Sequence, residues 1–468
     1  MRNGARTFRL YLQGWVGAVG ILVLTAGLAG GLPARAQNPA ASSHKPVFYD
    51  NDFRYLLRPE TDSVYLGDQL KRLCLGPCIT YDVGGQFRLR YHGERNMRGL
   101  GLTGRDDDFL LYRTRLYTNV EIAERFRFYF EGIDAVSNYE DFPPRPIEEN
   151  RADVLNLFGD VQIWEGAAGS LSARLGRQEL IYGAQRTVSP LDWANTRRTF
   201  EGYKLFWQSE QWNVDAFWVR PVAVNAKKFD SPDYDQEFWG LYATRKWSKQ
   251  NTWDIYYLRL ENERDDFEFD TLGTRLAGER GLWSYEAELD LQLGKFQGRD
   301  HQAGSWTLGL GRKFPELPWS PALWAYYDWA SGSRTQGNGY HHLFPLAHKY
   351  LGHMDLFGRR NIESPNVQLT LSPCDRLKLA AWYYVFFLES TKDVPYTVVM
   401  SPFNGGNPPA DSYLGQEIDL TATWQLSPRA DILFGYSPFF AGDYYKDTPG
   451  LVYRGDADFF YTQFTLNF

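Results

Sequence analysis

After residue 36 the sequence lacks any run of about twenty apolar residues, the length that a helix needs to span a bilayer. It also lacks an excess of positive charge. The formal net charge of −7 becomes −11 once Arg2, Arg6, Arg9 and Arg35 of the N-terminal segment are set aside. The first absence excludes a bundle of membrane-spanning helices. The second argues against nucleic acid as a partner, because surfaces that bind nucleic acid are basic.

The N-terminal segment has the features of a Sec-type signal peptide over residues 1–36. Three arginines precede the apolar run WVGAVGILVLTAGLAGGL, and Ala34 and Ala36 have the small-residue spacing of a cleavage site. We expect cleavage after Ala36. The alternative is a retained membrane anchor, which would be a short one. A polar tail follows over residues 37–79.

Cysteine is scarce, with only Cys74, Cys78 and Cys374. In an oxidising compartment, the first two can close a small disulfide within CLGPC, just before the patterned part of the chain. An equally good interpretation is that the two cysteines are unpaired residues without a role in an exported tail. A metal site would need further ligands, and none lies nearby in the sequence, so we expect no metal and no cofactor.

Aromatic residues, by contrast, are abundant at 16% of the chain. The mean hydropathy is −0.46, which is typical of a soluble protein. A membrane β-barrel has a similar value, because half of each strand faces a polar lumen. Composition alone therefore leaves two classes open, a secreted β-protein and an outer-membrane barrel.

Alternation of apolar and polar residues continues along the chain from about residue 80. In RFRFYFE (125–131) every second residue is Phe, and in WSYEAELDLQLG (283–294) apolar residues alternate with Glu, Asp and Gln. Alternate side chains of a strand point to opposite faces, so this period of two predicts strands and not helices. Such segments predict about eighteen strands, an even number, as in bacterial single-chain barrels.

The segments between these strands sort into two classes. Short connections occur near 123–125, at 209–211, 248–250, 278–280, 372–375 and 427–430. Mostly longer ones alternate with them, at 93–107, 138–152, 180–197, 221–234, 330–362 and 389–411. Short turns on one rim and long loops on the other are typical of an outer-membrane barrel. The sequence therefore predicts a transmembrane, antiparallel, up-and-down all-β barrel over residues 80–468.

The end of the chain, DFFYTQFTLNF, fits this architecture as a closing strand. Phe460, Phe464 and Leu466 share one parity and are expected to face lipid, while Gln463 and Thr465 face the lumen. Strands in lipid must close into a barrel, because lipid offers no partner for a free edge. We therefore expect the outer membrane as the location and its lipid as a contact.

Several stretches resemble the alginate-export family of outer-membrane channels. They are RLGRQELIYGAQRTVSPLDWANTRRTFEG (174–202), FPLAHKYLGHMDLFGRRN (344–361), GQEIDLTATWQL (415–426) and FGYSPFFAGDYY (434–445). The resemblance extends from about residue 80 to the end of the chain. It implies an eighteen-stranded barrel, an arginine-lined lumen and passage of an anionic, alginate-like polysaccharide. Periplasmic export or assembly proteins are further candidate partners.

Fixed positive charge inside the barrel is what such transport needs. Guanidinium groups bind carboxylates through paired hydrogen bonds and keep their charge, and rings of Arg or Lys select anions in pores. The predicted lining residues lie on the polar parity of the early strands or close to them: Arg88, Arg90, Arg113, Arg115, Arg127, Arg174, Arg177, Arg186 and Lys204. The alternation of apolar and polar positions changes parity near LGRQEL. Arg174 and Arg177 therefore need not point to the same face.

The same residues also fit a plainer interpretation, in which they are ordinary lumen residues balanced by Glu121, Glu131 and Asp160. The later strands carry acids, as in 283–293 and at Glu417, so the predicted wall is basic early and acidic late. A transverse field of this kind also occurs in general porins. The alternative function is therefore a general or small-solute-specific diffusion porin.

An enzyme is a rival class, since the loop at 330–362 holds His341, His342, His348 and His353. No GxSxG motif occurs, however, and loop histidines are more often solvated or hydrogen-bonded. A receptor would use the long loops, but loops that fold inward to narrow a pore explain them equally well. We therefore expect a passive channel and not an enzyme.

Overall fold

The structure is a computed structural model that describes residues 39–58, 65–99, 101–333, 338–403 and 407–468. The predicted signal peptide lies outside the described residues. Residues Ala40–Phe468 form one compact unit. Within the described residues, no helix has the length and hydropathy needed to cross a membrane.

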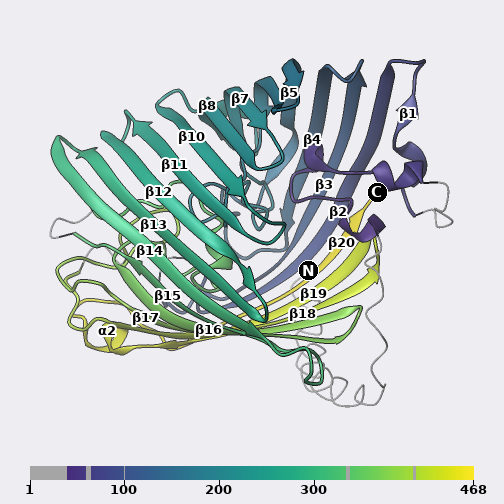
Figure 1. Cartoon of the computed structure of the whole chain (residues 1–468). Helices are drawn as coiled ribbons and strands as arrows, with labels where there is room; N and C mark the ends of the chain where they lie inside the picture. The colour runs from purple at the N-terminus through teal and green to yellow at the C-terminus, as the bar shows by residue number, and fades with distance from the viewer. Residues whose placement is uncertain (1–38, 59–64, 100, 334–337, 404–406) are drawn as a thin grey trace. The chain divides into compact units, whose positions relative to one another are not determined.

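Eighteen antiparallel strands close into a β-barrel, which confirms the predicted fold class (Figure 1). Each strand pairs with the next barrel strand along the chain. The ring closes where Gln86 faces Asn467 and Arg95 faces Asp458. The strands are β2 (Ile79–Arg95), β3 (Asp107–Ile122), β4 (Phe126–Asn138), β5 (Asn150–Gly166), β6 (Gly169–Gln178), β7 (Phe200–Gln208), β8 (Trp212–Ala223), β10 (Gln236–Lys246), β11 (Thr252–Asn262), β12 (Phe267–Arg280), β13 (Trp283–Phe296), β14 (Arg299–Lys313), β15 (Ala322–Ala330), β16 (Ile362–Cys374), β17 (Leu377–Phe387), β18 (Tyr413–Ser427), β19 (Ala430–Ala441) and β20 (Ala457–Asn467).

Smaller elements lie outside this ring of strands. Two short strands pair with β2 and with β8 respectively. The elements are β1 (Leu73–Cys74), β9 (Ser231–Pro232), α2 (Asp443–Asp447) and the 3-10 helices η1 (Pro39–Ser42), η2 (Phe48–Asp50), η3 (Arg54–Leu57), η4 (Asp68–Leu70) and η5 (Ala347–Lys349). All three cysteines are exposed and free, so Cys74 and Cys78 form no disulfide.

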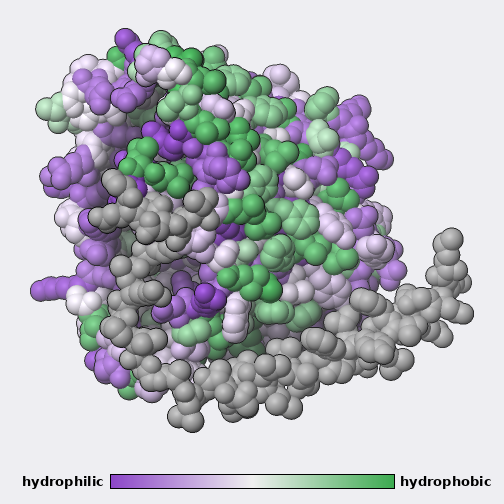
Figure 2. Space-filling model, turned by 90° about the vertical axis from the view of Figure 1, so that its right-hand side faces the viewer, coloured by the Kyte–Doolittle hydropathy of each residue, from purple (hydrophilic) through white to green (hydrophobic). Residues whose placement is uncertain are grey.

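The two faces of the strands differ as the alternation predicts. On β13, Leu289 is 55% exposed, whereas Asp290 and Gln292 are buried toward the lumen. On β4, Phe126 and Phe128 are half exposed in the same way. Figure 2 shows hydrophobic side chains gathered across the middle of the visible face, with hydrophilic ones to either side. The outer surface therefore presents the apolar parity to lipid.

The two rims also differ as predicted. One rim carries short turns, and we call it the short-turn end; the other carries the long loops. β12 continues to Arg280, so the turn expected at 278–280 lies at 281–282. At the long-loop end, the connections at 263–266 and 297–298 are nevertheless short.

The long loops enter the barrel and fill much of its lumen. Tyr340, Tyr350 and Phe357 of the loop at 331–361 are buried in one apolar cluster with Tyr384 and Phe386 of β17. The loop at 179–199, which we call the inner loop, joins a second cluster with strands β7 to β11. Packed side chains rather than open water therefore occupy the long-loop half of the lumen.

The N-terminal tail also packs against the inner wall. Val47, Phe48 and Tyr49 are buried in a cluster with Tyr129 of β4 and Phe158 of β5. From the sequence, residues 37–79 are expected to form a polar tail that precedes the barrel. The structure places part of that tail inside the ring of strands.

Candidate functional site

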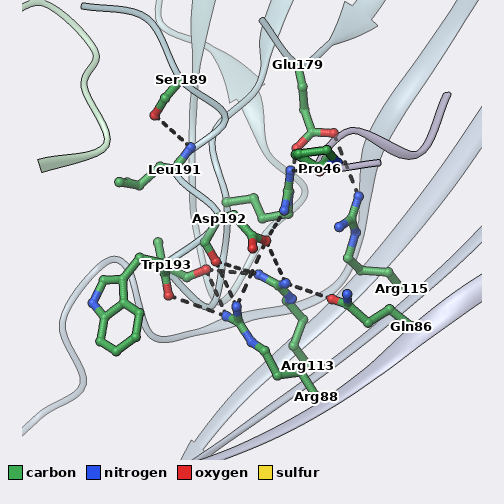
Figure 3. A network of polar contacts seen from close by, with 12 residues as sticks. Pro46, Gln86, Arg88, Arg113, Arg115, Glu179, Ser189, Leu191, Asp192 and Trp193 are labelled. Atoms are coloured by element: carbon green, nitrogen blue, oxygen red, sulfur yellow. Dashed lines mark hydrogen bonds and ion pairs between the residues drawn. The ribbon is translucent and has the colours of Figure 1, made fainter. Parts of the chain in front are cut away.

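Guanidinium groups gather around the inner loop (Figure 3). Four belong to neighbouring residues on β2 and β3 that face the lumen because they share the polar parity of their strands. The set, which we call the arginine cluster, consists of Arg88, Arg90, Arg113, Arg115 and Arg197. Only Arg197 lies on the inner loop itself. The four strand arginines were predicted from the sequence.

The inner loop presents oxygen atoms to this cluster. The Arg88 Nη1 donates to the carbonyl oxygen of Asp192 over 2.8 Å. The Arg113 Nη1 donates to the same carbonyl over 3.1 Å and to that of Ala194 over 3.2 Å. The Arg113 Nη2 also forms an ion pair of 2.8 Å with Asp192 Oδ1. Arg197 contacts the same carboxylate.

The Asp192 carboxylate is therefore shared by several cations. Its side chain is 49% exposed, whereas the Arg113 side chain is fully buried. Burial within the barrel raises the pKa of this carboxyl, but the guanidinium groups of Arg113 and Arg197 outweigh it and hold the pKa well below its usual range. The carboxylate is thus ionised, accessible to water and bound to buried arginines.

Arg90 is held differently from the other cluster members. Its Nη2 donates to the Trp193 carbonyl over 2.7 Å, and its guanidinium lies 3.7 Å from the centroid of the Trp193 ring. Trp193 in turn stacks on His348, with ring centroids 3.4 Å apart. Among the described residues, no carboxylate lies within ion-pair distance of Arg90. This cation is consequently the least neutralised one in the cluster.

Arg115 and Arg197 are balanced by acids. Arg115 pairs with Glu131 at 2.6 Å and lies 3.8 Å from Glu179, which also contacts Arg197. The carboxylates that meet the arginine cluster are Asp192, Glu179 and Glu131. Guanidinium groups therefore outnumber carboxylates, and the site has a net positive charge even after pairing.

Arg127 and Arg174 form a separate group nearer the short-turn end. Both face the tail, since Arg127 donates to the Tyr49 carbonyl over 2.5 Å and Arg174 lies 4.4 Å from the Tyr49 ring centroid. Arg174 is also paired with Asp160 through two hydrogen bonds of 2.7 and 2.8 Å. Lys204 pairs with Asp215 at 2.7 Å.

A cavity of about 240 Å³ adjoins this second group. Arg174 and Lys204 line it together with Tyr49 and Asp50 of the tail. The remaining lining residues are Glu179, Ile181, Tyr182, Gly183, Phe206, Gln208, Asn213, Asp215, Tyr242 and Thr244. The lining mixes charges of both signs with aromatic rings.

Two predicted residues lie away from both groups. Arg177 has Leu157 and Glu201 as its cross-strand partners. Leu157 is 41% exposed, and the Glu201 side chain is exposed to the same extent, so Arg177 points to the outer face of the barrel and not into the lumen. Arg174 and Arg177 differ in direction because they are three residues apart on a strand whose side chains alternate with a period of two.

Arg186 is on the inner loop, where it reaches across to β13. Its guanidinium pairs with Glu286 at 2.9 Å and with Glu288 at 2.8 Å. On β18, Glu417 and Asp419 accept hydrogen bonds from backbone N–H groups of the loop at 331–361. The acids of the later strands therefore hold the loops in place.

Sequence reasoning missed three parts of the site: Asp192, Arg197 and residues 46–50 of the tail. Asp192 and Arg197 stand in the quoted stretch SPLDWANTRR, which was treated as a family motif and not as a source of ligands. The signal there was an aspartate and two arginines on a loop beside arginine-bearing strands. For the tail, the sequence carries no comparable signal.

The four loop histidines do not form a metal centre in the described residues, where no group of three or more His, Cys, Asp or Glu side chains is arranged to hold a metal ion. His348 and His353 stack on each other, with centroids 4.7 Å apart. Burial lowers the pKa of His348 well below its usual value. These side chains serve as packing elements between the loop and the wall.

A closed eighteen-stranded barrel with short turns on one rim, inward loops and charged groups in the lumen defines an outer-membrane channel protein. The sequence comparison agrees, because the alginate export family matches residues 80–454. The chain belongs to this family, as its motifs predicted. A comparison with curated protein sequences finds no significant match.

Solved structures of outer-membrane porins share the fold. OccK3 (OpdO) of Pseudomonas aeruginosa has a TM-score of 0.56 at 12% identity, over 83% of this chain and 96% of its own. OccD3 (OpdP) of the same organism has a TM-score of 0.55 at 13% identity, over 82% of this chain and 91% of its own. OccAB1 of Acinetobacter baumannii has a TM-score of 0.55 at 10% identity, over 83% of this chain and 96% of its own. At such identities the likeness concerns the fold alone.

Proposed function

We propose that this outer-membrane channel passes small carboxylate-bearing solutes by passive diffusion, through a constriction formed by the arginine cluster and residues 191–194. The observation that carries this proposal is the binding of the Asp192 carboxylate by Arg113 at 2.8 Å, with Arg88 and Arg197 beside it. Asp192 occupies the position that a solute carboxylate would take. A permeating anion would exchange with it for the same donors.

The geometry of these donors supports recognition of carboxylates rather than of anions in general. A guanidinium offers paired N–H donors in a plane that matches the two oxygens of a carboxylate. The arginines are buried and fixed by their other bonds, such as the 2.7 Å bond from Arg113 to Gln86. Fixed donors lose little conformational freedom when they bind a solute, so exchange between Asp192 and a solute needs no large rearrangement.

The filled lumen favours a small solute over a polymer. Tyr340, Phe357 and Tyr384 are buried in an apolar cluster that joins the loops to the wall. A polysaccharide thread would have to open this cluster along its whole path, and packed cores are costly to disrupt. A small solute needs only a local displacement of side chains.

Passage of an anionic, alginate-like polyuronate is the second candidate function. Membership of the alginate export family favours it, and the positive arginine cluster suits a polyuronate as well as a monomer. In this case the loops would have to move out of the lumen together.

Planar bilayer recordings of the mature channel test both candidates. In a KCl gradient we expect a reversal potential on the anion side, and in a glucuronate gradient a measurable glucuronate permeability. Polymannuronate, added separately, should leave the current unchanged. Block of the current by the polymer would instead support the polysaccharide candidate. Cation preference would contradict both.

The variant Arg113→Gln sharpens this test, because it removes a fully buried strand cation that binds the Asp192 carboxylate directly. It is expected to lower the glucuronate permeability and shift the reversal potential toward the cation side. Arg177→Gln is the matched control, since it removes the same charge from the outer face. Equal effects of the two substitutions would contradict a role for the arginine cluster.

A further inference from the structure

The part of the tail inside the barrel contacts arginines of the inner loop and of the lumen wall. The Pro46 carbonyl accepts a hydrogen bond of 2.9 Å from Arg197 Nη2. The Phe48 ring lies 3.8 Å from the Arg115 guanidinium, a cation–π contact. The Tyr49 carbonyl accepts from Arg127 over 2.5 Å. Backbone oxygens and aromatic rings of the tail thus occupy positively charged groups of the lumen.

Tyr49 contacts both the wall and the inner loop. Its ring meets Phe158 edge-on at 5.1 Å and lies 4.4 Å from the Arg174 guanidinium. Its hydroxyl donates to the backbone carbonyl of Glu179, the first residue of the inner loop. Only 7% of Tyr49 is exposed. One tail residue therefore joins the wall, the inner loop and the 240 Å³ cavity.

A single arginine on the short-turn rim anchors the tail on both sides of this insertion. Arg429 lies in the turn between β18 and β19. Its Nη1 donates to Ser43 Oγ over 2.6 Å, and its Nη2 donates to Tyr55 Oη over 2.5 Å. It also pairs with Asp68 at 2.6 Å. Residues 43–57 are therefore clamped at the rim, with 46–50 projecting into the lumen.

We infer that the lumen wall at the short-turn end is a docking surface for a peptide segment, and that its occupant is residues 43–57 of this same chain, which act as a plug. The plug competes with permeating anions, because it occupies Arg115, Arg127 and Arg174 with its own rings and carbonyls. It lowers both the conductance of the channel and its preference for anions.

This inference rests on the proposed function, in that both concern the passage of anions. The two can fail separately. Conductance in KCl reports on the plug without any organic solute, whereas glucuronate permeability reports on the solute class.

The test compares single-channel conductance and reversal potential of the mature chain with those of the variant Phe48→Ala/Tyr49→Ala. Loss of both rings removes the contacts with Arg115 and Arg174. We expect a higher conductance and a shift of the reversal potential toward the anion side. Arg54→Ala is the matched control, because that tail side chain is 78% exposed, and it should behave as the unmodified channel.

A synthetic peptide of residues 43–57 makes the test specific. Added to the bath facing the short-turn end of the alanine variant, it should lower the conductance again, whereas the same peptide with Phe48 and Tyr49 replaced by Ala should not. If the alanine variant does not fold, Phe48→Leu/Tyr49→Leu keeps apolar packing but loses the ring contacts, and a smaller rise is expected. Conductance and reversal potential that stay unchanged in a folded variant would overturn the inference.

Discussion

Among single residues, Asp192 carries the negative charge that Arg113, Arg197 and Arg88 share. Those cations hold its pKa well below the usual range, so it remains ionised at any pH at which the channel is used. A fixed carboxylate at a constriction lowers the local positive potential and repels anions. The charge of this one side chain therefore limits the anion preference that the arginine cluster can produce.

Asp192→Asn is expected to raise the anion preference of the channel. The amide oxygen still accepts a hydrogen bond from Arg113, so the inner loop keeps its position while one negative charge is lost. The reversal potential in a KCl gradient measures the effect. Asp300→Asn, at an exposed position where β14 begins, serves as a control and should leave the reversal potential nearly constant. Equal shifts in the two variants would contradict a local role of Asp192.

The attachment of the loop at 331–361 is expected to depend on pH through its residue Asp355. Burial raises the pKa of its carboxyl to about 7, from the usual 3.8. The groups that face it are His348, whose Nδ1 lies 3.0 Å away, together with His353, Asp419, Arg145 and Arg90. Because the folded state raises this pKa, the stability contributed by protonated Asp355 is complete below about pH 4. It is lost as the pH rises through 7.

We therefore expect the loop to be less firmly seated at pH 8 than at pH 5. At about 1.4 kcal/mol per pH unit between pH 5 and the pKa of about 7, the difference amounts to roughly 3 kcal/mol at most. Open-channel current noise, which reports loop motion, should increase between these two pH values. The Asp355→Asn side chain carries no charge at either pH, so the current noise of this variant should be low and equal at both pH values. Noise that rises equally with pH in this variant would contradict the assignment.

At the scale of elements, buried ion pairs of one arginine help to attach the inner loop to β13. Arg186 pairs with Glu286 and Glu288 of β13, and all three side chains are largely buried. Breaking a buried ion pair by removing one partner costs about 3–5 kcal/mol, because the remaining charge is left without compensation. Glu286 keeps its pair with Arg275 at 2.7 Å, so the lower part of that range applies.

Arg186→Gln is thus expected to loosen the inner loop by about 3 kcal/mol. Limited trypsin digestion of the folded channel measures this as faster cleavage within residues 179–199. Lys313→Gln is the control, since its exposed pair with Glu279 is worth only about 0–1 kcal/mol. The double variant with Glu288→Gln should recover part of the protection, because it removes the uncompensated charge. An unchanged cleavage rate in Arg186→Gln would contradict the tether.

At the scale of the whole molecule, the barrel is stabilised by an apolar outer band and by closure between β2 and β20. Leu289 lies in the middle of β13 and is 55% exposed on this band, whereas Leu282 lies in the turn before β13. Charge on the lipid face costs more at mid-height than at the rim.

Leu289→Arg is expected to destabilise the barrel by about 2–4 kcal/mol, and Leu282→Arg by about 0–1 kcal/mol. Urea unfolding of the channel in lipid vesicles measures both free energies. Equal costs at the two positions would show that the apolar band does not lie in the membrane as described.

Much of the architecture was predictable because it depends on local patterns. Alternation in 283–294 predicted the faces of β13, and turn length predicted the two rims. Turn positions near 278–280 were off by a few residues, since strand ends depend on pairing with neighbours. The tail was not predictable, because the partners of Phe48 and Tyr49 lie about seventy or more residues away in sequence.

The sequence by itself determined the class of fold and the parity of Arg88, Arg90, Arg113 and Arg115, because each strand alternates with a period of two. Its motifs indicated the family. Only the tertiary structure decided what those arginines meet. Asp192 lies far along the chain from Arg113, and Phe48 far from Arg115, and closure of the barrel brings each pair together. Long-range pairing across a closed ring leaves no local trace in the sequence. The ligands of the site therefore became visible only in three dimensions.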